Sequence, residues 1–269
     1  MSIFTVFGGS GFIGRNLVEA LRRDGHDVTA IGRDIDFSSR RHLGRVIYAA
    51  GATGGAATCP IAMLDVHATL LEKVIHHFDF DSFVYLSSTR VYGLEGQSPS
   101  THEDSRLSCS ADAADWFALT KLCGESLCVN SKKPGVSVAR LANIYGADQH
   151  PSTFLAAVRR DCLERGGTTI NETPASCKDY LSIDDAVRYL CGLAASGTGG
   201  IYNIASGTTF SHQQLAQDLT MLGFKIDFTP QALQRRFPPV DVAKISHLFG
   251  PPLRNLRSDL PVIFQSHYN

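Results

Sequence analysis

The sequence has no long hydrophobic run and no excess of charge of either sign. No stretch approaches the roughly 18 apolar residues that a membrane-spanning helix needs, and the first residues lack the basic segment of a secretory signal. The 25 Lys and Arg residues nearly balance the 26 Asp and Glu residues, which leaves a formal net charge of −1. This balance argues against nucleic acid and against a membrane as partners. We therefore expect a soluble, unprocessed, cytoplasmic protein.

Paired cysteines and metal-ligand clusters are missing as well. The seven cysteines form an odd, scattered set without a Cys-x-x-Cys pair and without a histidine at ligand spacing. The pair His76-His77 lies at the polar end of a helical pattern, which is more typical of a solvated surface than of a metal site. We expect reduced structural thiols and no metal. The cysteines are Cys59, Cys109, Cys123, Cys128, Cys162, Cys177 and Cys191.

The sequence does contain an alternation of short apolar runs and helical periods. The run Ile3–Phe7 is followed by apolar residues at a 3.6-residue period until Gly25, which is typical of a strand and then a helix. Three more strand-like runs follow, and the last two flank an amphipathic helix from Met63 to Phe78. In 269 residues this alternation predicts an α/β fold of the Rossmann type, a doubly wound parallel sheet with helices on both faces. The three runs are Val28–Ile31, Val46–Ala50 and Phe83–Leu86.

One connection in this alternation is short. About a dozen residues, from Arg33 to Arg45, join the second strand to the third, where a doubly wound fold normally has a strand and a helix. We expect a helix to be absent or vestigial there, with Asp36-Phe37 at most a remnant strand. A second irregularity begins near residue 147, where the alternation of strands and helices stops. The alternation returns only in a segment at about residues 178–205. This predicts a nucleotide-binding domain over residues 1–146, including that return, and a smaller C-terminal substrate lobe over residues 147–269.

A glycine-rich turn joins the first strand to the first helix. Backbone amides at such a junction, with the positive end of the helix, bind the pyrophosphate of a dinucleotide, and each glycine removes a Cβ that would block the approach. Because the turn follows a strand and opens a helix, a glycine turn without a ligand is the less favoured interpretation. The predicted cofactor-binding residues are Gly8, Gly9, Ser10, Gly11, Phe12, Ile13 and Gly14.

Residues 117 to 121 read Phe-Ala-Leu-Thr-Lys, which is a Tyr-x-x-x-Lys pattern without the tyrosine hydroxyl. Side chains four positions apart share one face of a helix, so Lys121 would lower the pKa of a phenol at position 117 toward that of a useful general base. Phe117 keeps the ring but cannot transfer a proton.

Several motifs resemble, in order along the chain, the extended branch of the short-chain dehydrogenase/reductase family, the sugar-nucleotide epimerases, dehydratases and reductases. The glycine spacing G-x-x-G-x-x-G opens the series, and Thr120-Lys121 with Glu125 matches the helix that carries the Tyr-x-x-x-Lys pattern. The other matching segments are Ala49-Ala50-Gly51, Ser87 to Gly93, Arg140 to Gly146, Lys178 to Asp185, Tyr202 to Gly207 and Asp241 to Lys244.

The resemblance implies a hydride exchanged between a sugar carbon and a nicotinamide, while a proton moves at the neighbouring oxygen. Ser88 matches the serine or threonine that donates a hydrogen bond to the reacting oxygen, and Lys121 matches the lysine that holds the cofactor ribose. Asn143 matches the residue that contacts the diphosphate of a nucleoside-diphosphate sugar. Lys178 stands where the family has an arginine, and we expect it near the same phosphates. The implied catalytic positions are Ser88, Phe117 and Lys121; the cofactor contacts add Ala49, Ala50 and Gly51; the substrate contacts are Ser88, Thr89, Asn143 and Lys178. The family also commonly forms a homodimer through the two helices that correspond here to residues 63–77 and 112–129.

The end of the second predicted strand bears on the choice of cofactor. A carboxylate there would bind the 2′-hydroxyl of NAD, whereas Gly32-Arg33 offers a small residue and a guanidinium that could hold the 2′-phosphate of NADP. We favour NADP. The alternative is that Arg33 is a solvated loop charge beside Asp34 and that Asp36 binds the adenosine end of NAD.

Three interpretations of Phe117 stay open. It is a deliberate replacement in an otherwise complete enzyme, or a natural residue in an enzyme whose proton transfer runs through Ser88, Thr89 or a water, or the mark of a nucleotide-binding module without catalysis. We favour the first two, because Ser88, Lys121, Asn143 and Tyr202-Asn203 retain the polar site. Loss of a general acid or base typically costs about 10²–10⁴ in rate, so the chain should bind better than it turns over. A carbonyl reductase acting on a non-nucleotide substrate is a further alternative.

Overall fold

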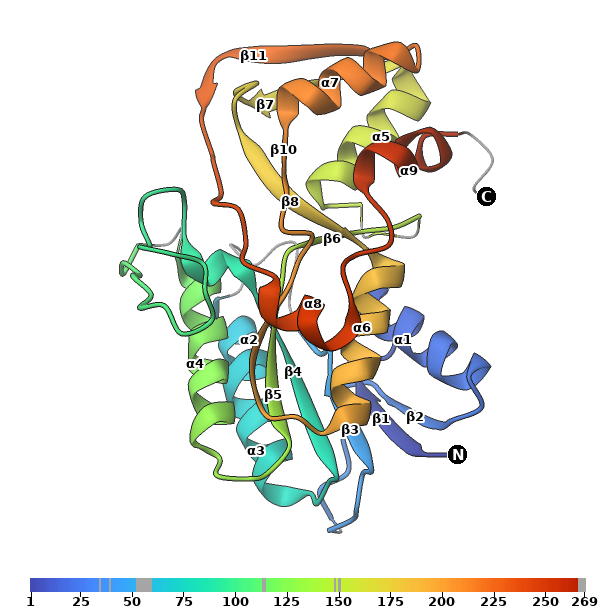
Figure 1. Cartoon of the computed structure of the whole chain (residues 1–269), viewed down its shortest axis with the longest axis vertical. Helices are drawn as coiled ribbons and strands as arrows, with labels where there is room; N and C mark the ends of the chain where they lie inside the picture. The colour runs from blue at the N-terminus through green and yellow to red at the C-terminus, as the bar shows by residue number, and fades with distance from the viewer. Residues whose placement is uncertain are drawn as a thin grey trace.

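The computed structural model describes residues 1–33, 35–38, 40–51, 60–112, 115–147, 149 and 151–265. Its largest element is a six-stranded sheet in which every neighbouring pair is parallel. The strand order is β2 (Asp27–Ile31), β1 (Ile3–Phe7), β3 (Arg45–Tyr48), β4 (Ser82–Ser88), β5 (Val136–Leu141) and β9 (Gly200–Ile204). The Rossmann-type sheet expected from the sequence is confirmed (Figure 1).

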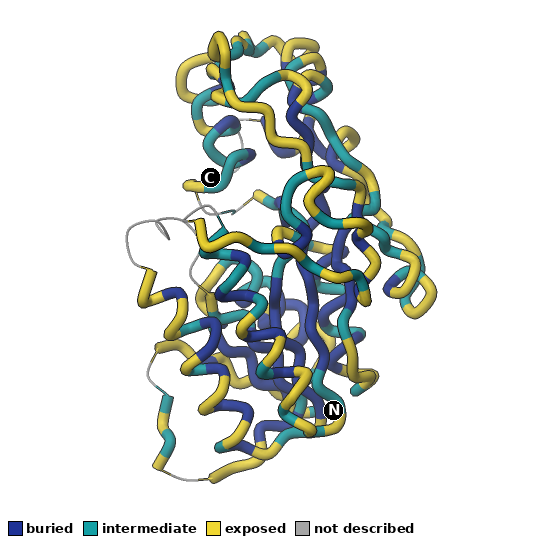
Figure 2. Tube along the Cα trace, turned by 90° about the vertical axis from the view of Figure 1, so that its left-hand side faces the viewer, coloured by how far each residue is buried: buried dark blue, intermediate teal, exposed yellow. Residues whose placement is uncertain are grey.

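Helices cover both faces of this sheet, because each presents an apolar stripe to the buried strands. On one face lie α1 (Phe12–Arg23), α6 (Ile183–Ser196) and α8 (Ala243–Phe249). The other face is covered by α2 (Pro60–Leu64), the π-helical turn η2 (Asp65–Thr69), α3 (Leu70–His77) and α4 (Trp116–Asn130). The buried strands form the centre of the molecule in Figure 2. None of the described helices is both long enough and apolar enough to span a bilayer.

In its described residues, the short connection between β2 and β3 has neither the usual extra strand nor the usual helix. Within its described residues, 32–33, 35–38 and 40–44, the structure has no helix and no strand beyond a single bridge from His42 to Asp79. Phe37 covers the sheet instead, stacking on Phe78 with ring centroids 5.4 Å apart. The expectation of an absent helix is therefore confirmed, and one aromatic side chain from the loop takes over part of its covering role.

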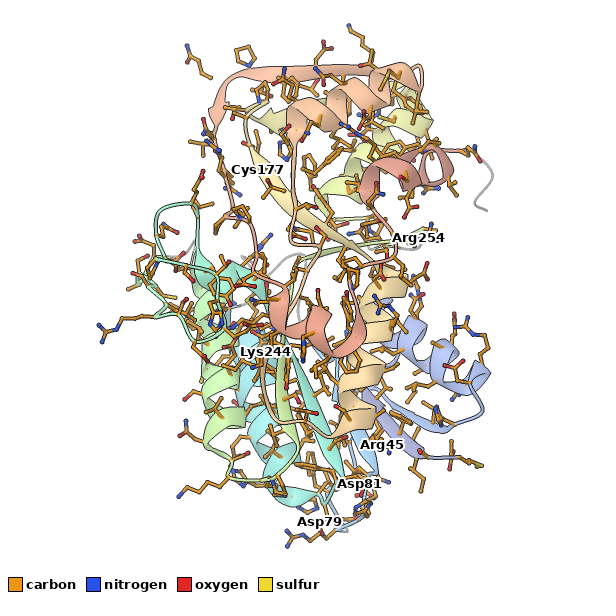
Figure 3. The ribbon with its side chains drawn as sticks, viewed as in Figure 1. Arg45, Asp79, Asp81, Cys177, Lys244 and Arg254 are labelled. Carbon is orange, nitrogen blue, oxygen red and sulfur yellow. The ribbon has the colours of Figure 1, made fainter. Side chains whose placement is uncertain are left out.

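A smaller layer lies beyond one end of the main sheet (Figure 1). It contains a three-stranded sheet, a two-stranded parallel sheet and three helices around a third apolar core. Arg45 at the start of β3 and Asp81 just before β4 mark the opposite end of the main sheet, so the carboxyl ends of the parallel strands point toward the smaller layer (Figure 3). Its elements are β6 (Asn143–Tyr145), α5 (Phe154–Arg165), β7 (Gly167–Glu172), β8 (Cys177–Ser182), β10 (Thr209–Ser211), α7 (His212–Met221), β11 (Lys225–Leu233) and α9 (Leu256–Ile263).

The two layers are joined by ion pairs of Arg254, whose side chain is about half exposed. Arg254 lies between α8 and α9 (Figure 3). It donates to both carboxylate oxygens of Asp259 and contacts Asp184 at the start of α6, with N–O distances of 2.9 to 3.2 Å. Asp259 also accepts from the Tyr145 hydroxyl at 2.7 Å. These contacts tie the last helix to the helix that covers the main sheet, and so fix the smaller layer over its carboxyl edge.

Candidate functional site

The residues predicted for the site gather at the carboxyl edge of the main sheet. Gly8 follows β1, Ala49 follows β3, Ser88 ends β4 and Asn143 begins β6 just after β5. In an open parallel sheet this edge is where ligands bind, since the connecting loops diverge there. Strands that lie far apart in the sequence therefore bring the predicted cofactor and substrate positions to one place.

The glycine turn after β1 has no room for side chains. Gly8 has a positive φ of 74°, and a Cβ on it would lie 2.7 Å from the backbone nitrogen of Ala50. A Cβ on Gly14 would lie 2.1 Å from the carbonyl oxygen of Gly8. Gly11 is the N-cap of α1, and no side chain of the described residues bonds the amides of that first turn. At this turn β1, α1 and the Ala49-Ala50 segment pack closely together. The amides at the start of α1 can therefore bind an anion.

Lys121 is fixed at the end of β4 by α4. Its Nζ donates to the carbonyl oxygen of Leu86 at 2.9 Å and lies 5.9 Å from the ring centre of Phe117. The side chain is 6% exposed, and burial lowers the pKa of Lys121 to about 7 against the opposing effect of the Glu125 carboxylate. The predicted pairing of positions 117 and 121 on one helix face is confirmed. The ammonium therefore lies next to an aromatic ring that carries no hydroxyl.

Ser88 and Thr89 differ in what their hydroxyls contact. The Thr89 hydroxyl donates to the carbonyl oxygen of Leu141 at 3.3 Å. The Ser88 oxygen accepts from the amide of Arg90 at 3.3 Å, which leaves its proton available to a ligand. Both residues line a cavity at the carboxyl edge. Because the Thr89 proton is already donated to Leu141 and the Ser88 proton is not, Ser88 is the better placed donor. The cavity is lined by Ser88, Thr89, Arg90, Tyr92, Leu141, Ala142, Asn143, Asp179, Phe237, Pro238 and Val240.

Asn143 and Lys178 occupy different surroundings. Asn143 lines the cavity, and its amide donates to the carbonyl oxygen of Asp179 at 2.8 Å. Lys178 is not among the lining residues: its Nζ lies 3.2 Å from the Glu172 carboxylate and 4.1 Å from the ring centre of Phe154. Burial lowers the pKa of Lys178, and Glu172 opposes that effect. A phosphate at Lys178 would therefore have to compete with a carboxylate already paired to it.

Two polar side chains near Phe117 were not predicted. Arg90 lines the cavity with its guanidinium carbon 5.5 Å from the Phe117 ring centre. His67 is fully buried, and its ring meets the Phe117 ring edge-on at 5.8 Å. The burial of His67 could have been predicted from the sequence, since position 67 falls on the buried helical stripe between Met63 and Leu71. Arg90 stands at one of the variable positions of the Ser-Ser-x-x-Val-Tyr-Gly motif, where no pattern marks it.

The candidate residues for cofactor choice follow β2. Arg33 is exposed, two residues beyond the last residue of the strand. Asp36 is also exposed and accepts from the amide of Ser38 at 2.8 Å, and hydrogen bonds from Ser38 lower the pKa of Asp36. Asp34 lies outside the described residues. One carboxylate oxygen of Asp36 is therefore engaged within its own loop, while the Arg33 guanidinium faces solvent.

The comparison with known families agrees with this geometry. A model of the NAD dependent epimerase/dehydratase family matches residues 4–205, from β1 to the end of β9. The chain belongs to the NAD-dependent epimerase/dehydratase family. A curated relative from Bacillus cytotoxicus, a UDP-N-acetyl-alpha-D-glucosaminuronate decarboxylase, is 25% identical over 261 residues, which cover 81% of this chain and 79% of the relative. The family is one of enzymes.

Solved structures confirm the fold of this epimerase/dehydratase family member. UDP-glucuronic acid 4-epimerase from Bacillus cereus, in complex with UDP-glucuronic acid and NAD, superposes with a TM-score of 0.81 at 19% identity over 97% of both chains. RMD from Pseudomonas aeruginosa, complexed with NADPH, superposes with a TM-score of 0.76 at 21% identity over 97% of this chain and 98% of that chain. Proteins of this fold are thus found with either form of the cofactor.

The glycine turn of this family member fits a nicotinamide dinucleotide. The amides of the first turn of α1 offer donors to a pyrophosphate, and the glycines leave the backbone uncovered there. Beside this turn, just after β3, Gly51 lies close to both Lys121 and His67, so a ribose would meet one cation and one imidazole. Donors for a pyrophosphate and contacts for a ribose therefore follow two neighbouring strands.

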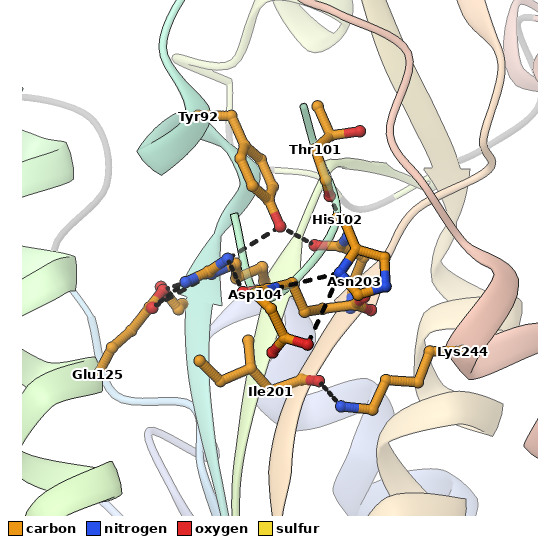
Figure 4. A network of polar contacts seen from close by, with 11 residues as sticks. Tyr92, Thr101, His102, Asp104, Glu125, Ile201, Asn203 and Lys244 are labelled. Carbon is orange, nitrogen blue, oxygen red and sulfur yellow. Dashed lines mark hydrogen bonds and ion pairs between the residues drawn. The ribbon is translucent and has the colours of Figure 1, made fainter. Parts of the chain in front are cut away.

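Some motif positions of the family prove structural in this chain. Arg140 pairs with Glu125 through two nitrogens at 2.7 and 3.1 Å and donates to the Tyr92 hydroxyl at 2.9 Å. Tyr92 in turn donates to Asn203 at 2.9 Å (Figure 4). All four side chains are buried. The network joins α4 to β5 and β9 and so orients the helix that carries Lys121. Asn203, which the sequence grouped with the polar site, belongs to this support instead.

Proposed function

We propose that this chain is an NAD(P)-dependent enzyme acting on a nucleoside-diphosphate sugar, of the epimerase, dehydratase or reductase type. The observation that carries the proposal is the meeting of a glycine turn, closely packed at Gly8 and Gly14, with Ser88 and Lys121 at one edge of the sheet. A nicotinamide bound there would supply hydride transfer. The function of the chain then follows from what its own side chains do around that position.

The side chains at this edge can bind the ligands, but the residue at position 117 cannot transfer a proton. The Ser88 hydroxyl is free to donate a hydrogen bond to the reacting oxygen of the sugar. Lys121, held by the carbonyl oxygen of Leu86, binds a ribose hydroxyl with its remaining protons. Phe117 transfers no proton, so we expect tight binding and slow turnover. A nucleotide-binding module without catalysis is the second candidate, and the ring without its hydroxyl is the observation in its favour.

The diphosphate of the substrate would lie along the cavity of Ser88 and Asn143. Arg90 is the cation of this cavity and offers a guanidinium to a phosphate. We propose Asn143 as a contact to the diphosphate, and Lys178 as a contact only if the substrate displaces Glu172 from it. The relative and one neighbour named above act on or bind UDP-sugars, which supports a uridine nucleotide as the first choice for testing. The smaller layer over this edge would then be the substrate-binding lobe, with residues 1–146 and the return at 178–205 as the dinucleotide-binding domain.

NADP is the proposed cofactor, with NAD as the alternative. Arg33 is exposed next to the end of β2, where a guanidinium could pair with a 2′-phosphate. Asp36, which would favour NAD, already accepts a hydrogen bond from Ser38. Titrating the protein with each dinucleotide, for the natural chain and for Arg33→Ala, separates the two. The proposal for NADP requires that Arg33→Ala weakens NADP binding and leaves NAD binding unchanged.

A homodimer is proposed through α2, α3 and α4. Ile61, Leu64 and Val129 on these helices are exposed apolar side chains, with 72%, 38% and 60% of their surface accessible. These side chains lie on the helices through which the family commonly dimerises, where a second copy of the chain would cover them. Light scattering of the purified protein, with Val129→Glu as the disrupting variant, tests this. A monomer at all concentrations would contradict it.

Thermal unfolding with ligands tests the function itself. The protein is heated with NADP or NAD and with UDP-, GDP-, CDP- or dTDP-sugars, and the midpoint is compared with that of the free chain. A ligand present at 100 times its Kd stabilises the folded state by about 2.7 kcal/mol. We expect one dinucleotide and one sugar nucleotide to stabilise together. Turnover of small ketones with no diphosphate requirement would instead favour a carbonyl reductase.

A further inference from the structure

His67 is held in an unusual backbone segment. It lies in the middle of η2, a π-helical turn between α2 and α3, and such turns often re-aim a side chain at a functional site. The Tyr48 hydroxyl donates to the carbonyl oxygen of Val66 at 2.7 Å, which occupies one carbonyl of the turn. Gly124 lets α4 approach, because a Cβ there would lie 2.5 Å from the carbonyl oxygen of His67. The imidazole is therefore placed by the packing of two helices.

The two ring nitrogens of His67 have different surroundings. Nδ1 lies 3.0 Å from the Thr120 hydroxyl, and that hydroxyl donates its proton to the carbonyl oxygen of Phe117 at 2.9 Å. Nδ1 must then carry a proton and donate to Thr120, which leaves Nε2 with a lone pair. The side chain is fully buried, and Nε2 has no hydrogen-bond partner among the described residues. Burial and the Lys121 charge lower the pKa of His67 to about 3, so the ring is neutral near pH 7.

An unpaired buried acceptor costs free energy unless a ligand satisfies it. The space that Nε2 faces is the one left empty by the missing side chain of Gly51. A Cβ on Gly51 would lie 3.4 Å from Nε2 of His67 and 3.7 Å from Nζ of Lys121. Gly51 itself is exposed, so a ligand can reach this residue from outside, whereas Nε2 of His67 is closed to solvent in the free chain. A lone pair and an ammonium at one point match a single chemical group, a hydroxyl, which donates to one and accepts from the other.

We propose that His67 and Lys121 form a hydroxyl-binding site over Gly51, and that its occupant is a hydroxyl of the nicotinamide ribose. This rests on the proposed binding of a pyridine dinucleotide. His67 is then a positioning residue: it fixes the ribose beside Phe117 through a neutral acceptor and does not itself touch the reacting carbon. A bound water between the same two groups is the competing occupant.

The test measures dinucleotide affinity by calorimetry for the natural chain and for His67→Phe and His67→Gln. His67→Phe keeps an aromatic ring against Phe117 and removes the acceptor, and we expect NADP and NAD to bind about threefold to tenfold more weakly. His67→Gln supplies an acceptor of similar reach and should restore most of the affinity. His212→Phe is the matched control, because His212 is also buried with ring nitrogens that make no hydrogen bond to the described residues, and its charged neighbour, Glu172 at 3.8 Å, lies in the smaller layer. It should leave dinucleotide affinity unchanged.

Dinucleotide analogues identify the occupant. In analogues whose nicotinamide ribose lacks the 2′- or the 3′-hydroxyl, one analogue should bind the natural chain and His67→Phe equally. If the effect of His67→Phe persists with both analogues, a water is the occupant and the proposal is wrong. Equal affinity of the natural chain and His67→Phe for NADP and NAD would also overturn it, while leaving the proposed function intact. If the natural chain binds neither dinucleotide, the proposed function fails first.

A spectroscopic readout covers the case in which His67→Phe does not fold. In ¹⁵N-histidine-labelled natural protein, Nε2 of His67 should show the shift of an unprotonated nitrogen, and that shift should move when the dinucleotide binds. A protonated Nε2, or a signal that dinucleotide saturation leaves in place, contradicts the proposal without any variant.

Discussion

Restoring the missing hydroxyl at position 117 is the perturbation with the largest expected effect. In Phe117→Tyr the new oxygen would lie near Lys121 and Arg90, whose charged groups are 5.9 and 5.5 Å from the present ring centre. A unit charge about 5 Å away at an effective dielectric constant of 20 is worth about 3 kcal/mol, or roughly two pKa units. The buried Lys121 should supply most of this shift, because solvent screens the exposed Arg90. The phenolate in turn favours the charged form of Lys121, whose pKa is otherwise about 7, so the ammonium is retained as the phenol ionises. The phenol pKa would then fall from about 10 toward 8, which suits a general base near neutral pH.

A general base of this kind is worth about 10²–10⁴ in rate. The assay follows the absorbance of the reduced nicotinamide, or sugar-nucleotide products by chromatography, with the dinucleotide and sugar nucleotide that stabilise the protein. We expect kcat to rise by that factor in Phe117→Tyr, with little change in dinucleotide affinity. Phe117→Leu is the control, since it changes the ring without adding a hydroxyl and should give no gain.

The reasoning fails if Phe117→Tyr folds, binds both ligands and shows no more turnover than Phe117→Leu. In that case the polar residues around position 117 serve binding alone, and the module without catalysis becomes the better account. A gain that survives Lys121→Met would contradict the assigned cause, because the lowered phenol pKa is attributed to the Lys121 charge.

Three further predictions follow from the packing and the buried charges. Gly8→Ala should destabilise the protein more than Gly25→Ala. Both positions have a positive φ, which costs an alanine about 1–2 kcal/mol, but only a Cβ at position 8 would meet backbone atoms, at 2.7 Å. Equal losses of unfolding free energy in chemical denaturation would refute the clash. Glu125→Gln should cost about 3–5 kcal/mol, since it breaks an ion pair whose side chains are 3% and 5% exposed, whereas Glu95→Gln, from a pair about half exposed, should cost less than about 1 kcal/mol. Because the pKa of His67 falls to about 3 on folding, the unfolded chain binds an extra proton between pH 3 and about 6.5, so acidification in that window lowers the unfolding free energy by about 1.4 kcal/mol per pH unit. His67→Gln should show a correspondingly shallower slope, and an unchanged slope would count against a neutral buried ring.

Local patterns predicted the main sheet well, because its signals are local. Ile3–Phe7 is a strand with the bounds expected from its apolar run, and the helix after it begins at Phe12, directly behind the glycine turn. The shortened connection was also visible, since a dozen residues cannot hold a strand and a helix with their turns. The glycine spacing supported the dinucleotide hypothesis because a Cβ at these positions would clash with the backbone, as the structure shows at Gly8 and Gly14.

Other features depend on contacts that no local pattern encodes. The π-helical turn shifts the helical register between Leu64 and Leu70, and only that shift and the approach of α4 direct His67 toward Lys121. Lys178 was expected near a phosphate, yet its neighbour Glu172 reaches it across the β7–β8 connection, six positions away. The parallel pair of β7 and β11 joins segments more than 50 residues apart, which sequence periodicity cannot register.

The most direct test of the account uses the single tryptophan of the chain. Trp116 precedes Phe117 at the start of α4, so its fluorescence reports on a nicotinamide bound at the carboxyl edge. Titration with NADPH and NADH should quench Trp116 and sensitise nicotinamide emission in a saturable way, and Gly8→Ala should abolish both changes. If neither reduced dinucleotide alters the fluorescence at any concentration, the glycine turn does not hold the cofactor and the central claim is wrong.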